Sequence, residues 1–329
     1  MISIISIISI IESFLNKKGV KTTMGRKLIK QGGGGYTIYL PKRWVDEKGL
    51  KAGDEIDIAE TKGGLLLRSE STPKLKEATL NIAFKDKTFI RYIMTNFYRA
   101  GYDKVTLTGD VKENDVKTPV DDLMGLAVTS VKEKEIAMEM LAEPFKDKAD
   151  KIIKKMFFII KDDMEYVVSC IEKGEHPDEK MMSYNSRRVM QRANLCIRSM
   201  SKKLIDLDGF YWIVITHLHW IERQLYYLSV RLNEEAPAKV GADHVEYLRS
   251  VQRSFDHLYD GIYKKSLPAL KKIHSEFTKY QTQKYELAAS DKTYISKIMV
   301  HFSMISRFLL YTTSSAIGMA TMHDMSEKE

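Results

Sequence analysis

The second half of the chain consists of long segments in which apolar residues recur at spacings of three and four. This spacing predicts amphipathic helices, because it places the apolar side chains on one face. The breaks between the segments are short and contain glycine or proline, for example at Gly174 and Pro268. Helices of this length joined by short breaks favour antiparallel bundles. Six helices are expected after Pro144, at residues 146–172, 179–206, 209–234, 242–264, 267–288 and 291–320.

The third and sixth of these segments share a local pattern. WIVITHLHWIERQLYYLS occupies residues 212–229 and KIMVHFSMISRFLLYTTS occupies residues 297–314. Both carry Ile-x-Arg, at Ile221 and Arg223 and again at Ile305 and Arg307. A pattern that repeats at a fixed offset indicates a duplicated unit. We therefore predict two antiparallel three-helix bundles, at residues 144–235 and 236–329.

The residues before Pro144 have a different character. Between residues 26 and 69, short alternating segments are separated by glycines, which predicts a small β module within residues 24–72. The run Gly32–Gly35 is interpreted as a hairpin turn and not as a phosphate-binding loop, because a strand pattern follows it where a helix would be required. Residues 75–142 alternate between strand and helix patterns, so that an α/β connecting segment is expected at residues 73–143. The predicted fold is thus multidomain and mainly α.

Composition restricts the class of protein. In 329 residues, 44% are hydrophobic and 29% are charged, which is typical of a folded globular protein and excludes long disorder. The 52 Lys and Arg residues outnumber the 44 Asp and Glu residues and give a net charge of +8. Two cysteines, Cys170 and Cys196, cannot form a disulfide framework, which favours a reducing compartment. No apolar run is long enough for a membrane span, so a soluble, cytoplasmic protein is expected.

Residues 1–23 stand apart from this pattern. They begin MISIISIISIIESFL and continue with Lys17, Lys18 and Lys21. The lysines follow the apolar run where a secretory signal would have them in front of it. We hypothesise that residues 1–23 are a dispensable leader, since patterned sequence begins at Met24. The alternative is a short interfacial anchor, with the isoleucines at a lipid boundary and the lysines at anionic headgroups.

The segment 179–206 is the most basic part of the chain. From Lys180 to Lys203 it contains seven cations and no carboxylate. At about 100° per residue, these cations fall within an arc of roughly 160°. One interpretation is a solvated face whose charges pair with acids on neighbouring helices; the other is a stripe that binds an anion or an acidic partner. The second interpretation names Arg187, Arg188, Arg192, Arg198 and Lys202 as the binding residues.

Motifs for catalysis or for a metal site are absent from the sequence. GxSxG, HExxH and EF-hand patterns do not occur. His219 and Glu222 lie three residues apart, so a predicted helix would place them on a common face, but a metal site needs further ligands. We therefore expect neither an enzyme nor a cofactor.

Residues 26–69, RKLIKQGGGGYTIYLPKRWVDEKGLKAGDEIDIAETKGGLLLRS, resemble the AbrB/SpoVT/MazE DNA-binding module. The resemblance lies in the strand, the helix that begins after Pro41, the Gly49-Leu50-Lys51-x-Gly53-Asp54 turn and the closing Gly63-Gly64 hairpin. It implies a barrel formed by two chains that exchange hairpins, and therefore a homodimer that contacts DNA. The matching basic residues are Arg26, Lys27, Lys30, Lys42 and Arg43.

The helical half, with the α/β segment before it, is similar to the PhoU regulators of phosphate uptake in the arrangement found in archaea. The similarity rests on the order of the helices and on GYDKVTLTG at residues 101–109. PhoU proteins place acidic residues four apart for clusters of iron or zinc. At the corresponding positions this chain has Glu222 with Tyr226, and Ser306 with Leu310, so we predict that no metal cluster is retained.

These resemblances imply a phosphate-responsive transcriptional regulator that binds DNA as a homodimer, with the helical half as a sensor or partner-binding domain. Two alternatives stay open. The chain is an adaptor that docks on a phosphate transporter or a sensor kinase, with the β module used only for dimerisation, or it is a MazE-type antitoxin. The β module has nine Lys and Arg against seven Asp and Glu between Met24 and Glu70. Its own charge is therefore compatible with only a modest DNA footprint.

Overall fold

A computed structural model describes residues 26–32, 35–61, 64–69, 75–83, 86–142, 149–205, 207, 209–289 and 293–326. The interpretations of residues 1–23 as a leader or an anchor lie outside these residues. The chain forms two compact units, Met1–Lys74 and Leu75–Glu329. The second unit holds the α/β segment and all the long helices, so three of the predicted domains form one body.

The described residues of the N-terminal unit form two hairpins and one short helix. Strands β1 (Ile29–Lys30) and β2 (Tyr36–Thr37) pair antiparallel across the glycine run, as do β3 (Ile56–Thr61) and β4 (Gly64–Ser69). Helix α2 (Lys42–Lys48) begins after Pro41 and ends at Gly49, whose φ of 66° is a left-handed conformation that glycine adopts without a Cβ clash. The predicted hairpins are therefore confirmed.

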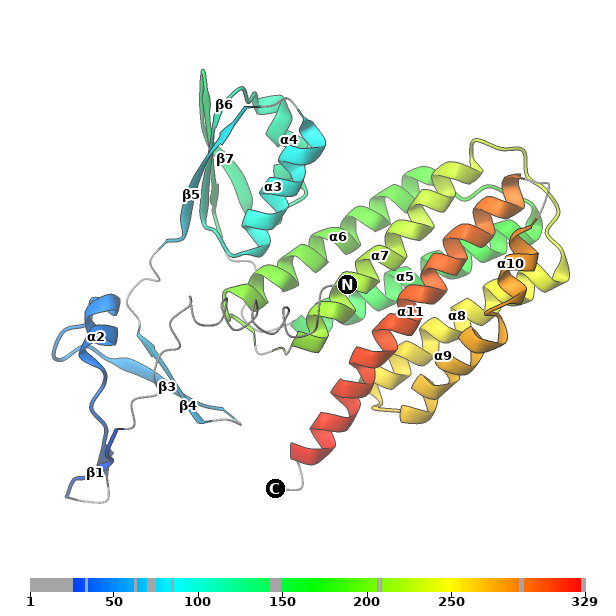
Figure 1. The fold of residues 1–329 in the computed structure, drawn as a ribbon. Helices are drawn as coiled ribbons and strands as arrows, with labels where there is room; N and C mark the ends of the chain where they lie inside the picture. Colours follow the sequence, from blue (N-terminus) through cyan, green and yellow to red (C-terminus); the bar gives the residue numbers. More distant parts are fainter. Residues whose placement is uncertain are drawn as a thin grey trace, which may run out of the picture. The chain divides into compact units, whose positions relative to one another are not determined.

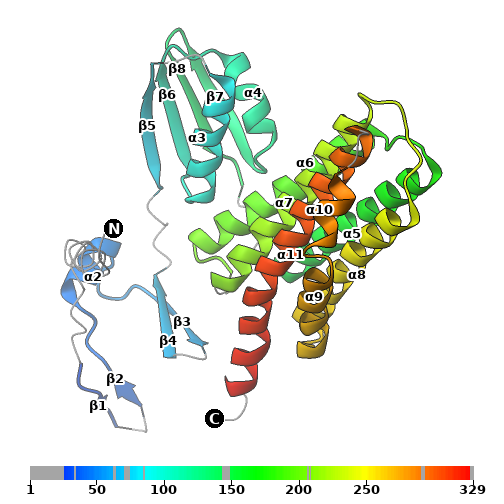
Figure 2. The same ribbon diagram turned by 45° about the vertical axis from the view of Figure 1, so that its right-hand side comes forward.

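The α/β segment is a four-stranded sheet with two helices on one face (Figures 1 and 2). Its order is β5-β6-β8-β7; β5 and β6 are parallel, and β8 pairs antiparallel with both β6 and β7. Apolar side chains such as Leu107, Ile136 and Met138 fill the space between sheet and helices. The elements in chain order are β5 (Glu77–Ile82), α3 (Lys87–Arg99), β6 (Lys104–Gly109), α4 (Glu113–Asp121), β7 (Leu126–Lys132) and β8 (Glu135–Met140).

Helix α4 is an addition to the sequence prediction, which placed no element between residues 110 and 125. It is short and polar and contains Pro119, so it lacks the long apolar period by which the other helices were found. Its side chains Val116 and Val120 are nevertheless buried.

The long helices agree closely with the predicted segments. They are α5 (Ala149–Lys173), α6 (Glu179–Ser201), α7 (Gly209–Leu232), α8 (Ala242–Tyr263), α9 (Leu267–Lys279), α10 (Gln283–Ala288) and α11 (Thr293–Ser326). The predicted helix at 267–288 is two helices, because the chain turns at Tyr280, whose buried ring packs on Tyr247 at 5.2 Å between centroids.

The helices share one hydrophobic core. A single cluster of buried side chains includes residues of α5, α6, α7, α8, α9 and α11. In Figure 1 and Figure 2, α7 and α11 lie side by side through the middle of this body. Helices from both predicted three-helix bundles therefore contribute to this core. Every helix that the structure describes is too short or too polar to cross a lipid bilayer.

Candidate nucleic-acid and partner sites

The five basic residues predicted to bind DNA are all exposed in the N-terminal unit. Three lie on or before β1, and two lie in the first turn of α2. Arg43 also forms an ion pair of 2.7 Å with Glu47, one turn further along the helix, in which its side chain is 83% exposed. An ion pair so exposed contributes little to stability and exchanges readily for a phosphate contact. The residues are Arg26, Lys27, Lys30, Lys42 and Arg43.

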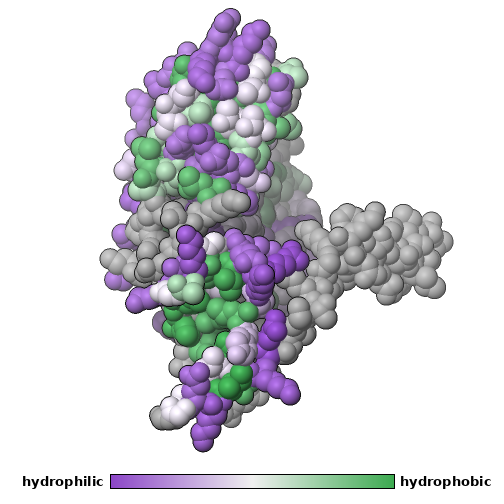
Figure 3. Space-filling model, turned by 90° about the vertical axis from the view of Figure 1, so that its left-hand side faces the viewer, coloured by the Kyte–Doolittle hydropathy of each residue, from purple (hydrophilic) through white to green (hydrophobic). Residues whose placement is uncertain are grey.

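The described side chains of the N-terminal unit form no buried core. Of the side chains that the structure describes between residues 26 and 69, none is buried. Tyr39 is 68% exposed and Leu65 is 69% exposed. Figure 3 shows hydrophobic side chains gathered between hydrophilic ones on this unit, in the lower part of the view. The exposed apolar side chains are Leu28, Ile29, Tyr36, Ile38, Tyr39, Ile58 and Leu65. Such a concentration of apolar surface marks an interaction site.

The basic face of α6 is the surface on which the α/β segment packs. The Arg198 guanidinium is completely buried; it donates to the carbonyl oxygens of Tyr98 and Tyr102 at 3.2 and 2.7 Å and to Asp103 Oδ1 at 2.8 Å. Lys202 Nζ donates to the same Oδ1 at 2.5 Å. Burial alone would raise the pKa of Asp103, but the contacts with Lys202, Lys76 N–H and Arg198 outweigh it and hold that pKa below its ordinary value.

A second ion-pair group lies further along the same face. Arg187 Nε approaches Asp122 Oδ1 at 2.8 Å, and Arg91 Nη2 of α3 approaches Asp122 Oδ2 at 2.7 Å. Asp122 is buried at the end of α4 and bridges the two arginines. Between the two ion-pair groups, Arg99 Nε donates to Asn194 Oδ1 at 2.8 Å.

Two of the predicted binding residues on α6 have no carboxylate partner among the described residues. Arg188 lies 5.2 Å from the Tyr184 ring centroid, and Arg192 donates to the carbonyl oxygen of Arg188 at 2.8 Å. Burial, with the charge of Arg188, lowers the pKa of Arg192. The predicted binding residues of this helix therefore fall into two groups. Arg187, Arg198 and Lys202 form ion pairs with the α/β segment. Arg188 and Arg192 are half-buried and form no ion pair with a described residue.

In the solvated-face interpretation, the charges of α6 pair with acids on neighbouring helices. Asp122, at the end of helix α4, is such an acid, whereas Asp103 lies in the turn before β6, and the Arg198 that it pairs with is buried. The sequence analysis did not single out Asp103 or Asp122. Asp103 did lie inside GYDKVTLTG, and this segment forms the loop that receives Arg198.

A pair of carboxyl groups lies inside the helical body. Asp163 of α5 and Glu222 of α7 are both buried, and Asn185 Nδ2 donates to Asp163 Oδ1 at 2.7 Å. Burial, together with the charge of Asp163, raises the pKa of Glu222, and burial raises the pKa of Asp163 to about 6. Burial also lowers the pKa of His219 to about 3, so its imidazole is neutral. Glu222 is therefore harder to ionise than an exposed glutamate.

These residues do not fit the metal clusters of PhoU proteins. No three His, Cys, Asp or Glu side chains in the described part of the chain converge as metal ligands. Glu222 faces Asp163 in the interior, and both of its oxygens lack a hydrogen-bond donor among the described residues. A multinuclear site needs several converging carboxylates, and among the described residues Glu222 is beside a single one, that of Asp163.

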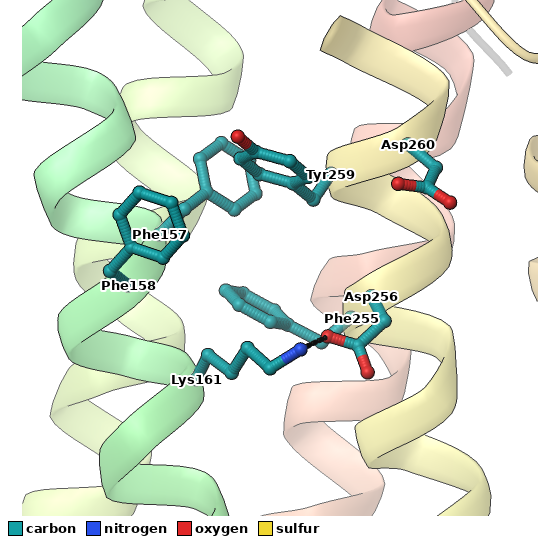
Figure 4. A pocket seen from close by; sticks show the side chains of 7 residues that line it. All are labelled: Phe157, Phe158, Lys161, Phe255, Asp256, Tyr259 and Asp260. Carbon is teal, nitrogen blue, oxygen red and sulfur yellow. Dashed lines mark hydrogen bonds and ion pairs between the residues drawn. The ribbon is translucent and has the colours of Figure 1, made fainter. Parts of the chain in front are cut away.

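A hollow lies between α5 and α8 in the helical body. In Figure 4, the rings of Phe157, Phe255 and Tyr259 face one another, and Lys161 reaches across to Asp256. The Lys161 Nζ to Asp256 Oδ1 distance is 2.7 Å, and the hollow has a volume of about 310 Å³. Its aromatic walls suit an apolar group.

The N-terminal geometry defines a small module of two hairpins and a short helix, with exposed basic and apolar side chains. The family described as antidote-toxin recognition MazE, bacterial antitoxin, matches residues 29–75. The resemblance of this module to the MazE and AbrB type is thereby confirmed. No curated protein and no solved structure matches the chain.

Proposed function

We propose that the chain is a regulator that dimerises through its N-terminal unit and binds DNA with it. The observation that carries this proposal is that the described side chains of this unit include no buried one. A unit with so little interior needs a second surface to cover its apolar side chains. A second copy supplies a matching surface, because a two-fold interface places the same patch on both sides.

The dimer also explains how a weakly charged unit binds DNA. Two copies bring together two sets of Arg26, Lys27, Lys30, Lys42 and Arg43, all of which are exposed. Affinity for duplex DNA rises with the number of phosphates that are neutralised. Ten cations on one surface give a footprint that a single unit lacks.

The helical body is the sensor in this proposal, and phosphate status is the signal. This part rests on the resemblance of the helix order and of GYDKVTLTG to PhoU regulators. A ligand or partner that binds the helical body changes the relative orientation of the two DNA-contacting units, and the spacing of half-sites makes DNA affinity depend on that orientation.

Salt dependence tests DNA binding directly. Fluorescence anisotropy with genomic fragments should show affinity that falls steeply between low and moderate salt. Replacement of Lys30 and Lys42 by Gln should weaken binding and reduce the salt dependence, whereas replacement of Lys87 and Lys117 in the α/β segment should change neither. DNA capture from the native cell should enrich sites upstream of phosphate-transport genes. Absence of DNA affinity at every salt concentration would refute the regulator and favour an adaptor that docks on a phosphate transporter or sensor kinase.

A second candidate function is that of an antitoxin. It is favoured by the description of the matching family, which names toxin recognition. The 255 residues that form the second unit speak against it, because antitoxins of this type usually continue in a short tail. Recovery of a toxin with the protein purified from its native cell would support the antitoxin.

A further inference from the structure

Helices α7 and α11 pack antiparallel along much of their length (Figures 1 and 2). His217 Nδ1 lies 2.9 Å from Thr312 Oγ1, and His301 Nδ1 lies 2.9 Å from Gln224 Oε1. Phe308 packs its ring on His217, with centroids 5.6 Å apart. The residues that face across this seam are therefore His217 and Gln224 on α7, and His301 and Phe308 on α11.

Exposed residues of α7 recur in α11 at the same offset as the Ile-x-Arg pattern. Trp220, Arg223 and Tyr227 on α7 correspond to Met304, Arg307 and Tyr311 on α11, each pair being 84 residues apart. The aromatic and methionine side chains are 37% to 52% exposed, although Ile221 and Ile305 beside them are fully buried. We call these six residues the α7–α11 face.

All six residues lie on the same side of the helix pair. Trp220 and Tyr227 each follow a seam residue by three positions, as do Met304 and Tyr311. Three positions along an α-helix correspond to about 60° around its axis. Because the helices are antiparallel, the same rotation turns both sets of side chains toward one side. The stretch from Val300 to Tyr311 spans about 16 Å at 1.5 Å per residue, or three turns of a helix.

The α7–α11 face is positive. Glu222 is the one acid in α7, and it is buried; α11 has no acid from Thr293 to His323. Arg223 packs on the Tyr227 ring at 4.6 Å, and neither Arg223 nor Arg307 forms an ion pair with a described residue. Beyond the end of α7, Lys297 Nζ forms ion pairs with Glu234 Oε2 at 3.6 Å and with Glu235 Oε1 at 2.8 Å.

This composition is that of a protein-binding surface. Trp, Tyr, Met and Arg are the side chains enriched at the centres of interfaces. A second copy of the same face is a poor partner, because it would set arginines against arginines. The charged groups are arginines, which pair with carboxylates in bidentate geometry, and they are too few for the polybasic surfaces that bind anionic lipid.

We propose that the α7–α11 face binds an acidic amphipathic helix of a partner protein. The apolar side of that helix covers Trp220, Tyr227, Met304 and Tyr311, and its carboxylates pair with Arg223 and Arg307. This proposal does not depend on DNA binding by the N-terminal unit.

A peptide library tests the proposal with the full-length protein. Amphipathic helical peptides of about 15 residues, with random charges on their polar side, are selected for binding. Asp and Glu should be enriched, and the selected acidic peptides should bind the R223E/R307E variant at least tenfold more weakly. Arg253→Glu, on the exposed side of α8, is the matched control and should bind as the wild type does.

Charge reversal separates lost binding from lost folding. The R223E/R307E variant should bind peptides in which the acids are replaced by Lys more tightly than the wild type does. Selected peptides without acidic enrichment, or equal binding by R223E/R307E, would overturn the proposal. The same variant is tested on vesicles of phosphatidylcholine with 30% phosphatidylglycerol. If the wild type binds these vesicles, R223E/R307E does not, and the selected peptides show no acidic enrichment, the face binds a lipid surface and not a helix.

Discussion

Arg198 of α6 and Asp103 of the α/β segment form an ion pair of 2.8 Å in which the guanidinium has no exposed surface. The two residues are 95 positions apart. Because Arg198 also donates to the carbonyl oxygens of Tyr98, at the end of α3, and of Tyr102, these contacts fix the α/β segment on the helical body.

Asp103→Asn should destabilise the second unit by roughly 2–4 kcal/mol, because it leaves a buried arginine without a counter-charge. Urea denaturation measures this effect. The control is Asp256→Asn, which breaks the Lys161–Asp256 ion pair, where both side chains are about half exposed. It should cost at most about 1 kcal/mol. Equal losses in the two variants would show that Asp103 does not anchor the α/β segment.

The Asp103 contact should also depend on pH. Its pKa is lowered in the folded protein, so the stabilisation is present above the ordinary pKa of an aspartate and is lost as the pH falls through the folded value. The stability difference between the wild type and Asp103→Asn should therefore shrink from pH 7 to pH 3. A difference that stays constant over this range would exclude a charged contact.

Glu222→Gln should stabilise the protein at neutral pH. The pKa of Glu222 is raised on folding, so the wild type loses stability as the pH rises above the ordinary value of 4.5, until the folded pKa is reached. An amide does not titrate, so the variant should gain roughly 1–3 kcal/mol at pH 7 and nothing near pH 4. Thermal unfolding across this range measures the difference. Asp162→Asn, on the exposed neighbour of Asp163, should change stability by less than about 0.5 kcal/mol. Destabilisation by Glu222→Gln at every pH would mean that the carboxylate is required in its charged form.

Gly101→Ala should destabilise the loop that holds Asp103, because it changes the backbone of that loop. Gly101 has φ of 80°, and a Cβ there would lie 2.7 Å from Lys202 Cγ. The expected cost is about 1–3 kcal/mol by chemical denaturation. Gly35→Ala is the control, because nothing lies within 4 Å of a Cβ at that position. Adding Lys202→Ala to Gly101→Ala should cost less than the two separate losses combined, because it removes the clash; strict additivity would contradict the close approach.

Much of the helical body follows from local sequence. The spacing of Ile153, Phe157, Ile160 and Met164, all buried on α5, illustrates the period from which each long helix was predicted. The proline and glycine breaks then set the ends of the helices to within a few residues. Local sequence does not specify whether the two predicted bundles share a core, because contacts between helices distant in the chain decide this.

The partners of charged residues could not be predicted in this way. The basic face of α6 was visible as a periodic pattern, but Asp103 and Asp122 lie about 65 to 95 residues away in polar turns. Likewise, Glu222 has its nearest carboxyl neighbour, Asp163, on another helix. A sequence pattern shows which face a side chain occupies; the fold alone determines what lies opposite.

The central claim is that the N-terminal unit completes its hydrophobic interior with a second copy. Light scattering coupled to size exclusion measures this directly on the full-length protein. The wild type should have the mass of a dimer, close to twice the 37.9 kDa of one chain. Ile38→Asp with Leu65→Asp should yield monomer and abolish DNA binding, whereas Tyr92→Asp, equally exposed on α3, should remain dimeric. A wild-type protein that is monomeric at micromolar concentration, or a double variant that remains dimeric and binds DNA, would contradict the account.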